Sequence, residues 1–468
     1  MEEAVQQAQI VEEAERSVRV KLRAAESILQ HLSLEKIEDT PSIAIPSNIG
    51  RSGLSSVVHH FLTEIGVQLP STSVQFEFND NLHETLLKGT LEKHLKKYKL
   101  TEEDVLVLEY AFPKFTKFVA EGPGAPVPDW ISSLSVLEDV VIAGTFDGCL
   151  VTNCFEQSKT TKGEELVVKH VEKDAHQTQI TSVSCFKLQG NPRYYAASAS
   201  KDASVAIRQL NNDLTVGKIV ATCVTGQGKS IETVATANSS DDTDDVLLAC
   251  AGWSADVYLF QVNCNSDDAE NASSRKSDKS GKRQREPEQG QVYQPVYTMR
   301  GHTDKISSVK WSGPVDPVTL FTASWDHSLR VWDCVRQVET AALHAQKPFT
   351  SIDYLQSKEI VASGHPDHVV RLWDARASGD AVVKLSIKGH RGWVSSVAFQ
   401  GGESTLLASA SYDRTVKVWD IRGGVCLQTI QTDVTGRLFS VVWGSDGRLL
   451  LGGSDATIRS YVAEAVSL

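Results

Sequence analysis

The chain has 468 residues, of which 41% are hydrophobic and 23% are charged, and its formal net charge is −12. It has no apolar run of membrane-spanning length, and its polar, acidic start is unlike a signal peptide, so we expect no membrane partner. The eight cysteines stand singly without metal-ligand spacing, which favours reduced thiols in an intracellular protein. The acidic balance argues against broad contact with nucleic-acid phosphates.

Residues 1–17 form an acidic extension rich in Glu, Gln and Ala, for which the sequence predicts either a short helix or disorder. Residues 18–111 then alternate runs of period two with amphipathic runs of period 3.6. The predicted elements are a strand over 18–22, a helix over 54–65, a strand over 74–78, a helix over 90–98 and a strand over 105–110. This order predicts an α+β domain of the ubiquitin-like (β-grasp) type.

From residue 130 to residue 465, short apolar runs alternate with turns rich in Gly, Pro and Asp. Two copies of the pattern, residues 301–333 and 389–420, begin with Gly-His and end with Trp-Asp. Seven turn aspartates recur, namely Asp147, Asp202, Asp256, Asp326, Asp367, Asp413 and Asp455. This is the WD-repeat signature, so the sequence predicts a mainly β protein whose larger part is a seven-bladed WD-repeat β-propeller.

The last repeat ends after its third strand, because only six residues follow Val462. An open sheet edge there would expose unpaired backbone groups. Residues 112–129, which hold four prolines, are predicted to be a linker. We expect part of this linker, within residues 115–122, to supply the outer strand that closes the ring.

Three blades carry a full set of His, Ser or Thr, Asp and Trp: His302, Thr322, Asp326 and Trp332; His344, Ser363, Asp367 and Trp373; His390, Ser409, Asp413 and Trp419. A single such set would resemble a Ser-His-Asp catalytic triad. Because the set recurs once per blade, the sequence favours a structural role, in which His and the hydroxyl satisfy a buried turn carboxylate. We therefore predict no catalytic residue. Blades one to three lack the Trp and have Asn153, Arg208 and Val262 in its place.

Residues 265–291 interrupt blade three before its outer strand, which is expected near 292–299. The segment has almost no apolar residues, so it is predicted to be disordered. It contains a basic cluster, Arg275, Lys276, Lys279, Lys282, Arg283 and Arg285. A nuclear-import signal, a contact with RNA and a merely solvated loop all fit this cluster.

Four aromatic residues are predicted to bind a partner, namely Trp253, Trp325, Trp393 and Tyr412. They lie in turns before the aspartates or in loops that enter a blade, which meet on one side of a propeller. Trp and Tyr are common binding hot spots. The alternative is that some of these rings pack against their neighbours.

The order of the two modules resembles a known family. The phrases VKLRAAESILQHLSLEKIEDTPSIAIPSNIGRSGLSSVVHHFL, KKYKLTEEDVLVLEY and DWISSLS are similar to those of the ribosome-biogenesis WD-repeat family of the Pescadillo–Bop (PeBoW) complex. The N-terminal module also resembles that of Notchless. The resemblance covers nearly the whole chain from Val18, whereas residues 1–17 do not match the short start of the family.

The resemblance implies a non-enzymatic assembly factor for the large ribosomal subunit, acting in pre-rRNA processing in the nucleolus and nucleoplasm. The implied partners are a Bop-type WD-repeat protein, Pescadillo, the AAA ATPase midasin and the pre-60S particle. It implies no cofactor of its own. Glu103 would complete a Mg²⁺ site supplied by midasin, because such an ion accepts an anionic oxygen. Glu102 and Asp104 flank Glu103 and are alternative ligands. The simpler interpretation is that Glu103 is one of three exposed acidic residues and has no ligand role.

The sequence also bears on two other functions. A substrate receptor of a cullin ubiquitin ligase is indicated by the WD-x-R pattern at Trp373–Arg376 and Trp419–Arg422, although Trp-Asp is required by the fold itself. An enzyme is disfavoured, since the sequence has no Gly-rich phosphate loop, no metal cluster and no unrepeated nucleophile beside a base.

Overall fold

The computed structural model of the chain describes residues 17–25, 39–64, 77–80, 85–87, 90–101, 105–111, 116–157, 164–188, 193–238, 245–264, 290–315, 318–374, 383–402, 404–422, 424–432 and 436–465. The chain divides near residue 117 into a small N-terminal unit and a large unit that carries the repeats. Within these stretches, no helix has the length and apolar character needed to cross a membrane.

In its described residues, the N-terminal unit is a five-stranded sheet of order β2-β1-β5-β3-β4 with two helices. Its elements are β1 (Ser17–Ala24), β2 (Ile43–Pro46), α3 (Arg51–Glu64), β3 (Glu77–Asp80), β4 (Thr85–Leu86), α4 (Leu91–Tyr98) and β5 (Val105–Ala111). The two central strands, β1 and β5, run parallel. Leu54, Val58 and Leu62 recur at helical spacing along α3 and are buried in one core with β1. The predicted α+β class is confirmed.

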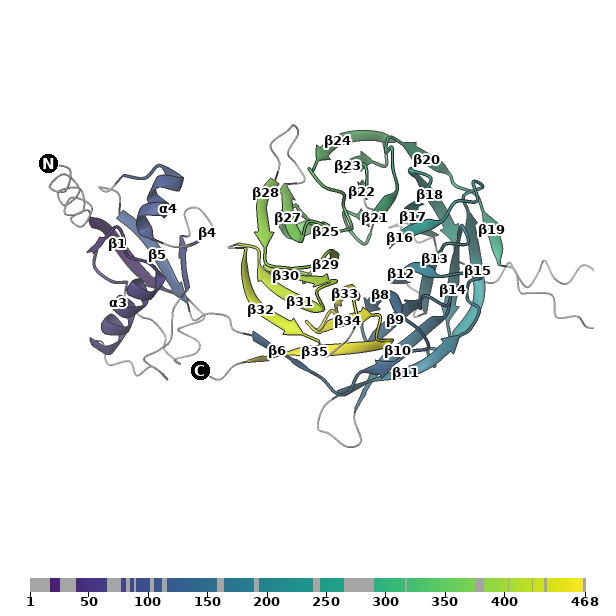
Figure 1. The fold of residues 1–468 in the computed structure, drawn as a ribbon, viewed down its shortest axis with the longest axis horizontal. Helices are drawn as coiled ribbons and strands as arrows, with labels where there is room; N and C mark the ends of the chain where they lie inside the picture. The colour runs from purple at the N-terminus through teal and green to yellow at the C-terminus, as the bar shows by residue number, and fades with distance from the viewer. Residues whose placement is uncertain are drawn as a thin grey trace, which may run out of the picture. The chain divides into compact units, whose positions relative to one another are not determined.

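In the described residues, the large unit is a ring of seven antiparallel sheets around a centre (Figure 1). The innermost strands are β8 (Ile131–Leu137), β12 (Ile180–Lys187), β16 (Ile231–Asn238), β21 (Ile306–Trp311), β25 (Ser351–Leu355), β29 (Val394–Phe399) and β33 (Leu438–Trp443). The second strands are β9 (Val140–Thr145), β13 (Tyr194–Ser200), β17 (Asp245–Gly252), β22 (Thr319–Ser324), β26 (Ile360–Gly364), β30 (Leu406–Ser411) and β34 (Leu449–Gly453). This arrangement confirms the predicted seven-bladed propeller.

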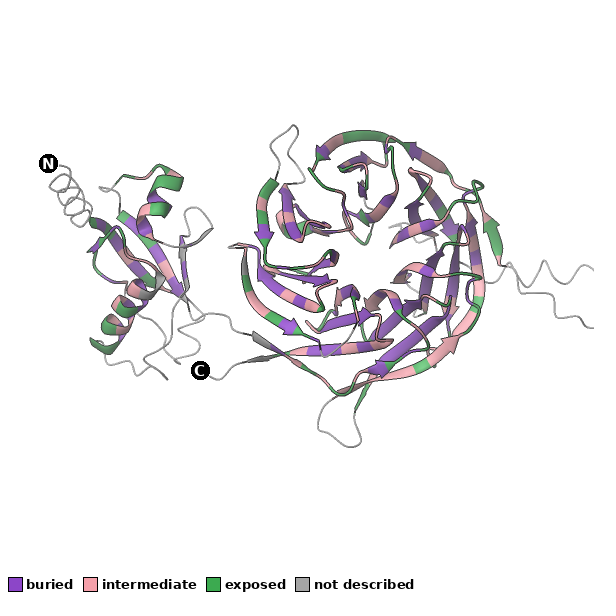
Figure 2. Cartoon of the chain, viewed as in Figure 1, coloured by how far each residue is buried: buried purple, intermediate pink, exposed green. Residues whose placement is uncertain are grey.

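The remaining two positions of each blade lie farther from the centre. The third strands are β10 (Leu150–Gln157), β14 (Ser204–Leu210), β18 (Asp256–Asn263), β23 (Ser328–Asp333), β27 (Val369–Asp374), β31 (Thr415–Asp420) and β35 (Thr457–Ala465). The outer strands are β11 (Glu164–Glu172), β15 (Val216–Val224), β20 (Tyr297–Arg300), β24 (Val338–His344), β28 (Val383–Lys388), β32 (Val425–Gln431) and β6 (Thr116–Ala120). Figure 2 shows that the outer strands carry more exposed residues than the second and third strands. A short 3₁₀ helix, η1 (Gln356–Lys358), joins β25 to β26.

The ring closes at blade seven, where β6 forms the outer strand beside β35. This strand comes from the range 115–122. The Gln428 side chain receives the Phe118 N–H at Oε1 (2.7 Å) and donates from Nε2 to the Phe118 carbonyl (2.9 Å). A side-chain amide thus bonds both backbone groups of one β6 residue and joins blade seven to blade six. The short strand β7 (Ala125–Pro126) also pairs with β35.

An arginine pairs with carboxylates from both sides of the closure. Arg448 leads into β34 of blade seven and pairs with Glu121, which follows β6 (3.4 Å), and with Glu164 of β11 in blade one. Its guanidinium also lies 4.1 Å from the centre of the Phe155 ring. Because one cation holds two neighbouring blades, charge as well as apolar packing ties the first blade to the last.

Blade three departs from the sequence prediction. Its outer strand is β20 alone, whereas β19 (Gln291–Tyr293) pairs in parallel with β15 of blade two. The expected single outer strand near 292–299 is therefore two strands in two different blades. The physical reason is that the long segment after β18 lets the chain reach the open edge of blade two before it returns. Residues 265–289, including the basic cluster, lie outside the described residues.

Deleting residues 265–289 is expected to shift the melting temperature by less than about 2 °C, since their composition gives the segment little apolar surface to bury. The flanking chain is held without it, because the Tyr293 hydroxyl donates to the Asn263 carbonyl at 3.1 Å. A thermal melt followed by circular dichroism measures the shift. A fall of many degrees would show that the segment packs on the propeller. Nuclear uptake of the same variant tests the import reading.

Candidate functional site

The predicted sets of polar residues form hydrogen-bonded chains inside blades four and six. The Trp332 indole N–H donates to Thr322 Oγ1 (2.8 Å), which lies 2.7 Å from His302 Nε2. His302 Nδ1 lies 2.8 Å from Asp326 Oδ2. A neutral imidazole that donates from Nδ1 to the carboxylate accepts the threonine proton at Nε2, so every polar group has a partner. Blade six repeats the chain with Trp419, Ser409, His390 and Asp413.

These chains stabilise ionised turn carboxylates. Burial alone would raise the pKa of Asp326, but hydrogen bonds from His302 and Ser328 outweigh burial and hold the pKa well below its usual range. In blade two, burial is likewise outweighed by hydrogen bonds, chiefly from His176, and the pKa of Asp202 falls to about 2. Each turn therefore keeps its negative charge and its fixed shape near neutral pH.

The same geometry resembles a catalytic triad but leaves no room for a substrate. The Ser409 side chain is buried, with 0% of the residue exposed. Its oxygen is 2.7 Å from His390 Nε2 and also accepts the Trp419 N–H at 2.7 Å. A catalytic serine must reach a substrate carbonyl, and the buried Ser409 hydroxyl is not accessible to a substrate. The arrangement suits cross-linking of strands rather than acyl transfer.

Blade five corrects one sequence assignment. His344 is exposed at the end of β24 and is not part of the blade-five set. His365, which is fully buried, takes the position instead: its Nε2 lies 2.8 Å from Ser363 Oγ and its Nδ1 lies 2.8 Å from the Pro348 carbonyl. Because both ring nitrogens of His365 already have these partners, the imidazole does not also bond Asp367. That carboxylate is held by Arg371 instead (2.6 Å).

His365 gives blade five a pH dependence. Burial, together with the charge on Arg371, lowers the pKa of His365 from 6.5 to about 4. Because the folded-state pKa is below the unfolded value, this contribution to stability is complete above about pH 6.5 and is lost as the pH falls toward 4. The shift corresponds to roughly 3 kcal/mol of unfolding free energy.

We expect the wild type to lose about 3 kcal/mol more unfolding free energy between pH 7 and pH 4 than His365→Gln, whose side chain does not titrate in this range. Urea titrations at several pH values measure both slopes. His344→Gln is the matched control, because that histidine is exposed. Parallel curves for the wild type and His365→Gln would contradict the assignment.

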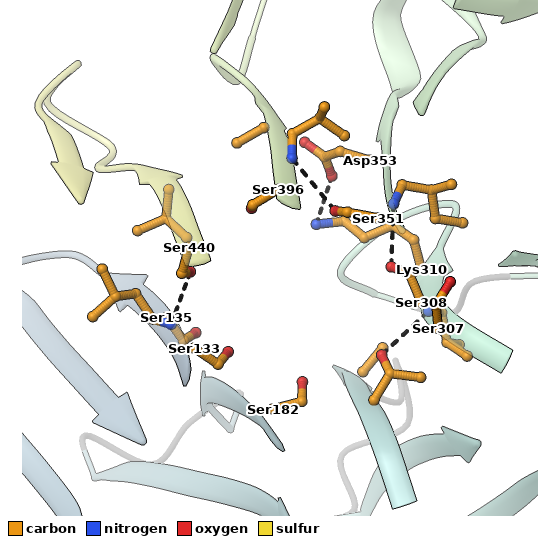
Figure 3. Close-up of a pocket in the computed structure, with 18 of the residues that line it drawn as sticks. Ser133, Ser135, Ser182, Ser307, Ser308, Lys310, Ser351, Asp353, Ser396 and Ser440 are labelled. Atoms are coloured by element: carbon orange, nitrogen blue, oxygen red, sulfur yellow. Dashed lines mark hydrogen bonds and ion pairs between the residues drawn. The ribbon is translucent and has the colours of Figure 1, made fainter. Parts of the chain in front are cut away.

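A cavity of about 750 Å³ lies at the centre of the ring, and serines of the innermost strands are prominent among the residues that line it (Figure 3). In the described residues, a hydroxyl of each innermost strand accepts a backbone N–H from the next blade at 3.1 to 3.4 Å. The pairs are Ser440 with Leu134, Ser133 with Val183, Ser182 with Val234, Thr233 with Val309, Ser308 with Ile352, Ser351 with Val397, and Ser396 with Val441. Seven such bonds, each worth about 1 kcal/mol, form a closed circle.

The circle of hydroxyls makes the cavity polar, but the oxygens of these hydroxyls already accept hydrogen bonds. Each hydroxyl that accepts from a neighbouring strand keeps its own proton for water or for a further acceptor. Two charged pairs line the cavity, and each is internally neutralised: Lys310 with Asp353 at 2.8 Å and Lys305 with Glu232 at 3.3 Å. The cavity therefore offers only weak, neutral hydrogen-bonding groups, so stronger binding is expected at its mouth.

The turns between second and third strands and the loops leading into the innermost strands lie on one side of the ring, which we call the aromatic face. Backbone hydrogen bonds join each turn to the loop of its own blade. Among them are Phe146 with Trp130, Trp253 with Ser230, Trp325 with Lys305, and Tyr412 with Trp393. All four sequence-predicted aromatic residues therefore lie on this face.

One aromatic cluster spans blades three and four. The Lys305 ammonium lies 4.6 Å from the Trp325 ring centre and 5.1 Å from the Trp253 ring centre. Glu232 accepts the Trp253 indole N–H at 2.7 Å and pairs with Lys305 at 3.3 Å. The two tryptophans remain 53% and 36% exposed, so the lysine orders them without covering them.

A second cluster spans blades six, seven and one. Trp393 stacks on Tyr412 with planes 13° apart, and the Tyr412 ring meets Phe439 edge-on. Phe439 in turn contacts Phe146 and Trp130. Trp393 is 46% exposed, whereas Tyr412 is half-buried, so Trp393 presents an exposed ring and Tyr412 supports it from below.

Sequence reasoning did not select Trp130, Phe146 or Phe439. Phe146 immediately precedes a turn aspartate, as Trp325 and Tyr412 do. That position was a signal for its place on the aromatic face, missed because blade one lacks a full polar set.

Other predicted site residues lie elsewhere or beyond the described part of the chain. Glu103, with its neighbours Glu102 and Asp104, is outside the described residues, in the segment that leads into β5. Arg376 is also outside them. Arg422 folds back on its own blade, with Nη2 2.6 Å from Asp420 Oδ2 and Nε 3.1 Å from both carboxylate oxygens.

The fold and this face can now be compared with known proteins. The WD domain, G-beta repeat family model matches residues 293–333, 382–420 and 424–461, and the NLE (NUC135) domain model matches residues 28–95. A solved structure, the WD40 beta propeller domain of Doa1, superposes with a TM-score of 0.54 at 15% identity, covering 75% of this chain and 98% of that one. This likeness concerns the fold alone.

A ribosome biogenesis protein WDR12 homolog of Nematostella vectensis is 30% identical over 446 residues, covering 91% of this chain and 96% of the relative. The chain belongs to the WDR12 family of ribosome biogenesis proteins. The WDR12 homolog of Arabidopsis thaliana is 25% identical over 431 residues and covers 91% of this chain and 93% of its own length. WDR12-family membership confirms the resemblance given by the sequence phrases, and the NLE match agrees with a Notchless-like N-terminal module.

Proposed function

We propose that this chain is an assembly factor for the large ribosomal subunit that binds partner proteins through two separate surfaces. The family supports ribosome biogenesis, and the division into two compact units supports two surfaces. Pre-rRNA processing and maturation of the pre-60S particle in the nucleolus and nucleoplasm are the processes in which it acts.

The aromatic face is the surface for the Bop-type WD-repeat protein, which in turn carries Pescadillo. The observation that carries this proposal is the exposure of three tryptophans there, Trp253, Trp325 and Trp393, each ordered by a neighbouring side chain. Ordered, exposed aromatic residues lose little entropy on binding and are the usual centres of protein interfaces.

The N-terminal unit is the surface for midasin, which removes the factor from the particle. Glu103 supplies a carboxylate to a Mg²⁺ ion held by midasin, and a carboxylate oxygen is the donor such an ion prefers. The ion belongs to the partner, and this chain contributes one ligand. Glu102 and Asp104 remain alternatives.

The proposed role is non-enzymatic. The buried hydroxyl of Ser409 and its equivalents bind strands rather than substrates. A cullin-ligase receptor is less favoured, because the Arg422 guanidinium that the WD-x-R pattern would offer is already paired with Asp420.

Affinity capture of the tagged full-length chain from nucleolar extract tests this proposal. We expect the Bop-type protein, Pescadillo and large-subunit precursors to be captured in a salt-stable complex. Capture of cullin and its adaptor, with no ribosomal precursor, would overturn the proposal in favour of the receptor function.

A further inference from the structure

In the described part of the chain, basic residues that form no ion pair gather on the aromatic face. Seven exposed basic residues of its turns and loops form no ion pair among the described residues: Lys173, Lys201, Lys229, Lys347, Arg391, Arg414 and Arg437. Among the described residues, the exposed carboxylates on the same turns and loops are fewer, namely Asp147, Asp174 and Asp304. Among the described residues, fully exposed cations therefore outnumber fully exposed carboxylates on this face, although the whole chain has a net charge of −12.

Many basic side chains elsewhere on the propeller are paired with acids. Lys187 pairs with Glu138, and Arg330 pairs with Glu339. Most turn aspartates of the aromatic face keep their negative charge, but their part-buried oxygens already accept hydrogen bonds from within the blade and are poorly placed to pair with a partner. Asp413, for example, accepts from His390 and from the Arg391 backbone N–H at 2.8 Å. The exposed cations of this face are therefore available to pair with carboxylates of an external partner.

Three of these cations belong to the turn and loops next to the stacked pair Trp393 and Tyr412. Arg437 lies 5.2 Å from the centre of the Tyr412 ring. Arg391 lies two residues before Trp393, and Arg414 lies two residues after Tyr412. An apolar platform thus has a cationic rim, and this combination binds a chain that presents both apolar and acidic side chains.

We propose that the aromatic face binds an acidic segment of a partner protein, whose carboxylates pair with Arg391, Arg414 and Arg437 while its apolar side chains pack on Trp393. This deepens the proposed function, on which it rests, by naming the chemistry that the partner presents.

The observations favour a protein over a single-stranded nucleic acid. Bases bind by stacking on free aromatic faces. Here Trp393 and Tyr412 already stack on each other, and the Lys305 ammonium lies over the Trp253 and Trp325 rings, 5.1 and 4.6 Å from their centres. The net charge of −12 also repels a polyanion at long range more strongly than a short acidic segment.

The test uses fluorescence anisotropy with the full-length chain and a labelled peptide of repeating Glu-Glu-Leu. The triple variant Arg391→Glu/Arg414→Glu/Arg437→Glu is expected to weaken binding at least about tenfold. The matched control, Lys218→Glu/Arg336→Glu/Lys384→Glu, makes the same charge change at exposed positions of β15, the β23–β24 turn and β28, and is expected to weaken binding less than about threefold. If the first variant does not fold, the three arginines are replaced by Gln instead.

Equal losses in the two triple variants would overturn the proposal, because binding would then reflect overall charge. A labelled oligouridine that binds while the acidic peptide does not would also overturn it, in favour of RNA. Binding of the Bop-type propeller is measured with the same proteins. If the wild type binds that propeller but not the peptide, the inference is wrong and the proposed function stands. If it binds the peptide but not that propeller, the proposed function alone is wrong.

Discussion

Replacing Trp325, Trp393 and Tyr412 together by Ala is expected to weaken binding to the Bop-type propeller by at least roughly a thousandfold, while the protein stays folded. A true hot spot costs about 2 kcal/mol or more on truncation, and two such losses already reach this figure. Trp325 and Trp393 are 36% and 46% exposed, so little of the core is disturbed by their removal. Isothermal titration calorimetry measures the affinity.

The matched control replaces three exposed valines away from the aromatic face by Ala, namely Val292, Val296 and Val335. This control should bind like the wild type. Tyr412 also packs on Phe439, so the thermal stability of each variant must be measured beside its affinity. Unchanged binding by the folded triple variant would place the partner on another surface.

Glu103→Ala is expected to abolish Mg²⁺-dependent binding to midasin and to leave the melting temperature of the chain unchanged. A divalent ion that loses an anionic ligand loses a strong electrostatic contact, whereas the propeller does not depend on this residue. Surface-plasmon resonance with Mg²⁺, and again with a chelator, separates the metal-dependent part of binding.

Glu102→Ala and Asp104→Ala serve as matched controls, because they remove the same charge one residue away. Each should keep most of the binding. Wild-type affinity for Glu103→Ala would contradict the assignment, and loss of binding in one of the two neighbours would identify the ligand instead.

The architecture could be predicted because it rests on repeated local signals. A turn aspartate followed six residues later by Trp marks the third strand in blades four, five and six. The hydrogen bonds from Trp332 through Thr322 to His302 are the physical cause of that spacing. Alternating apolar residues likewise located β1 and β5 of the N-terminal unit.

The incorrect predictions concern places where another residue or another strand edge in the folded chain took the expected position. Blade five needs a histidine near Ser363, and sequence spacing selected His344, whereas His365 reaches the serine from only two residues away. The strand β19 was assigned to blade three because chain order suggested it, but the open edge of β15 was within reach. Local patterns do not record which neighbouring edge is free.

The circle of hydroxyl bonds was not predicted either. A lone serine in an innermost strand, such as Ser308 or Ser351, is an ordinary polar residue in sequence. Its role depends on the distance between two blades, which only the closed ring defines. Phe439 and Trp130 were missed for the same reason, because their contact joins the last blade to the first.

Hydrogen–deuterium exchange of the full-length chain, with and without the Bop-type propeller, tests most directly whether the aromatic face is the binding surface. We predict slower exchange on binding at the turn and loop amides around Trp253, Trp325, Trp393 and Tyr412, with no change in the turns between third and outer strands, such as residues 334–337. Protection confined to those opposite turns, with unchanged exchange around the four aromatic residues, would contradict the account.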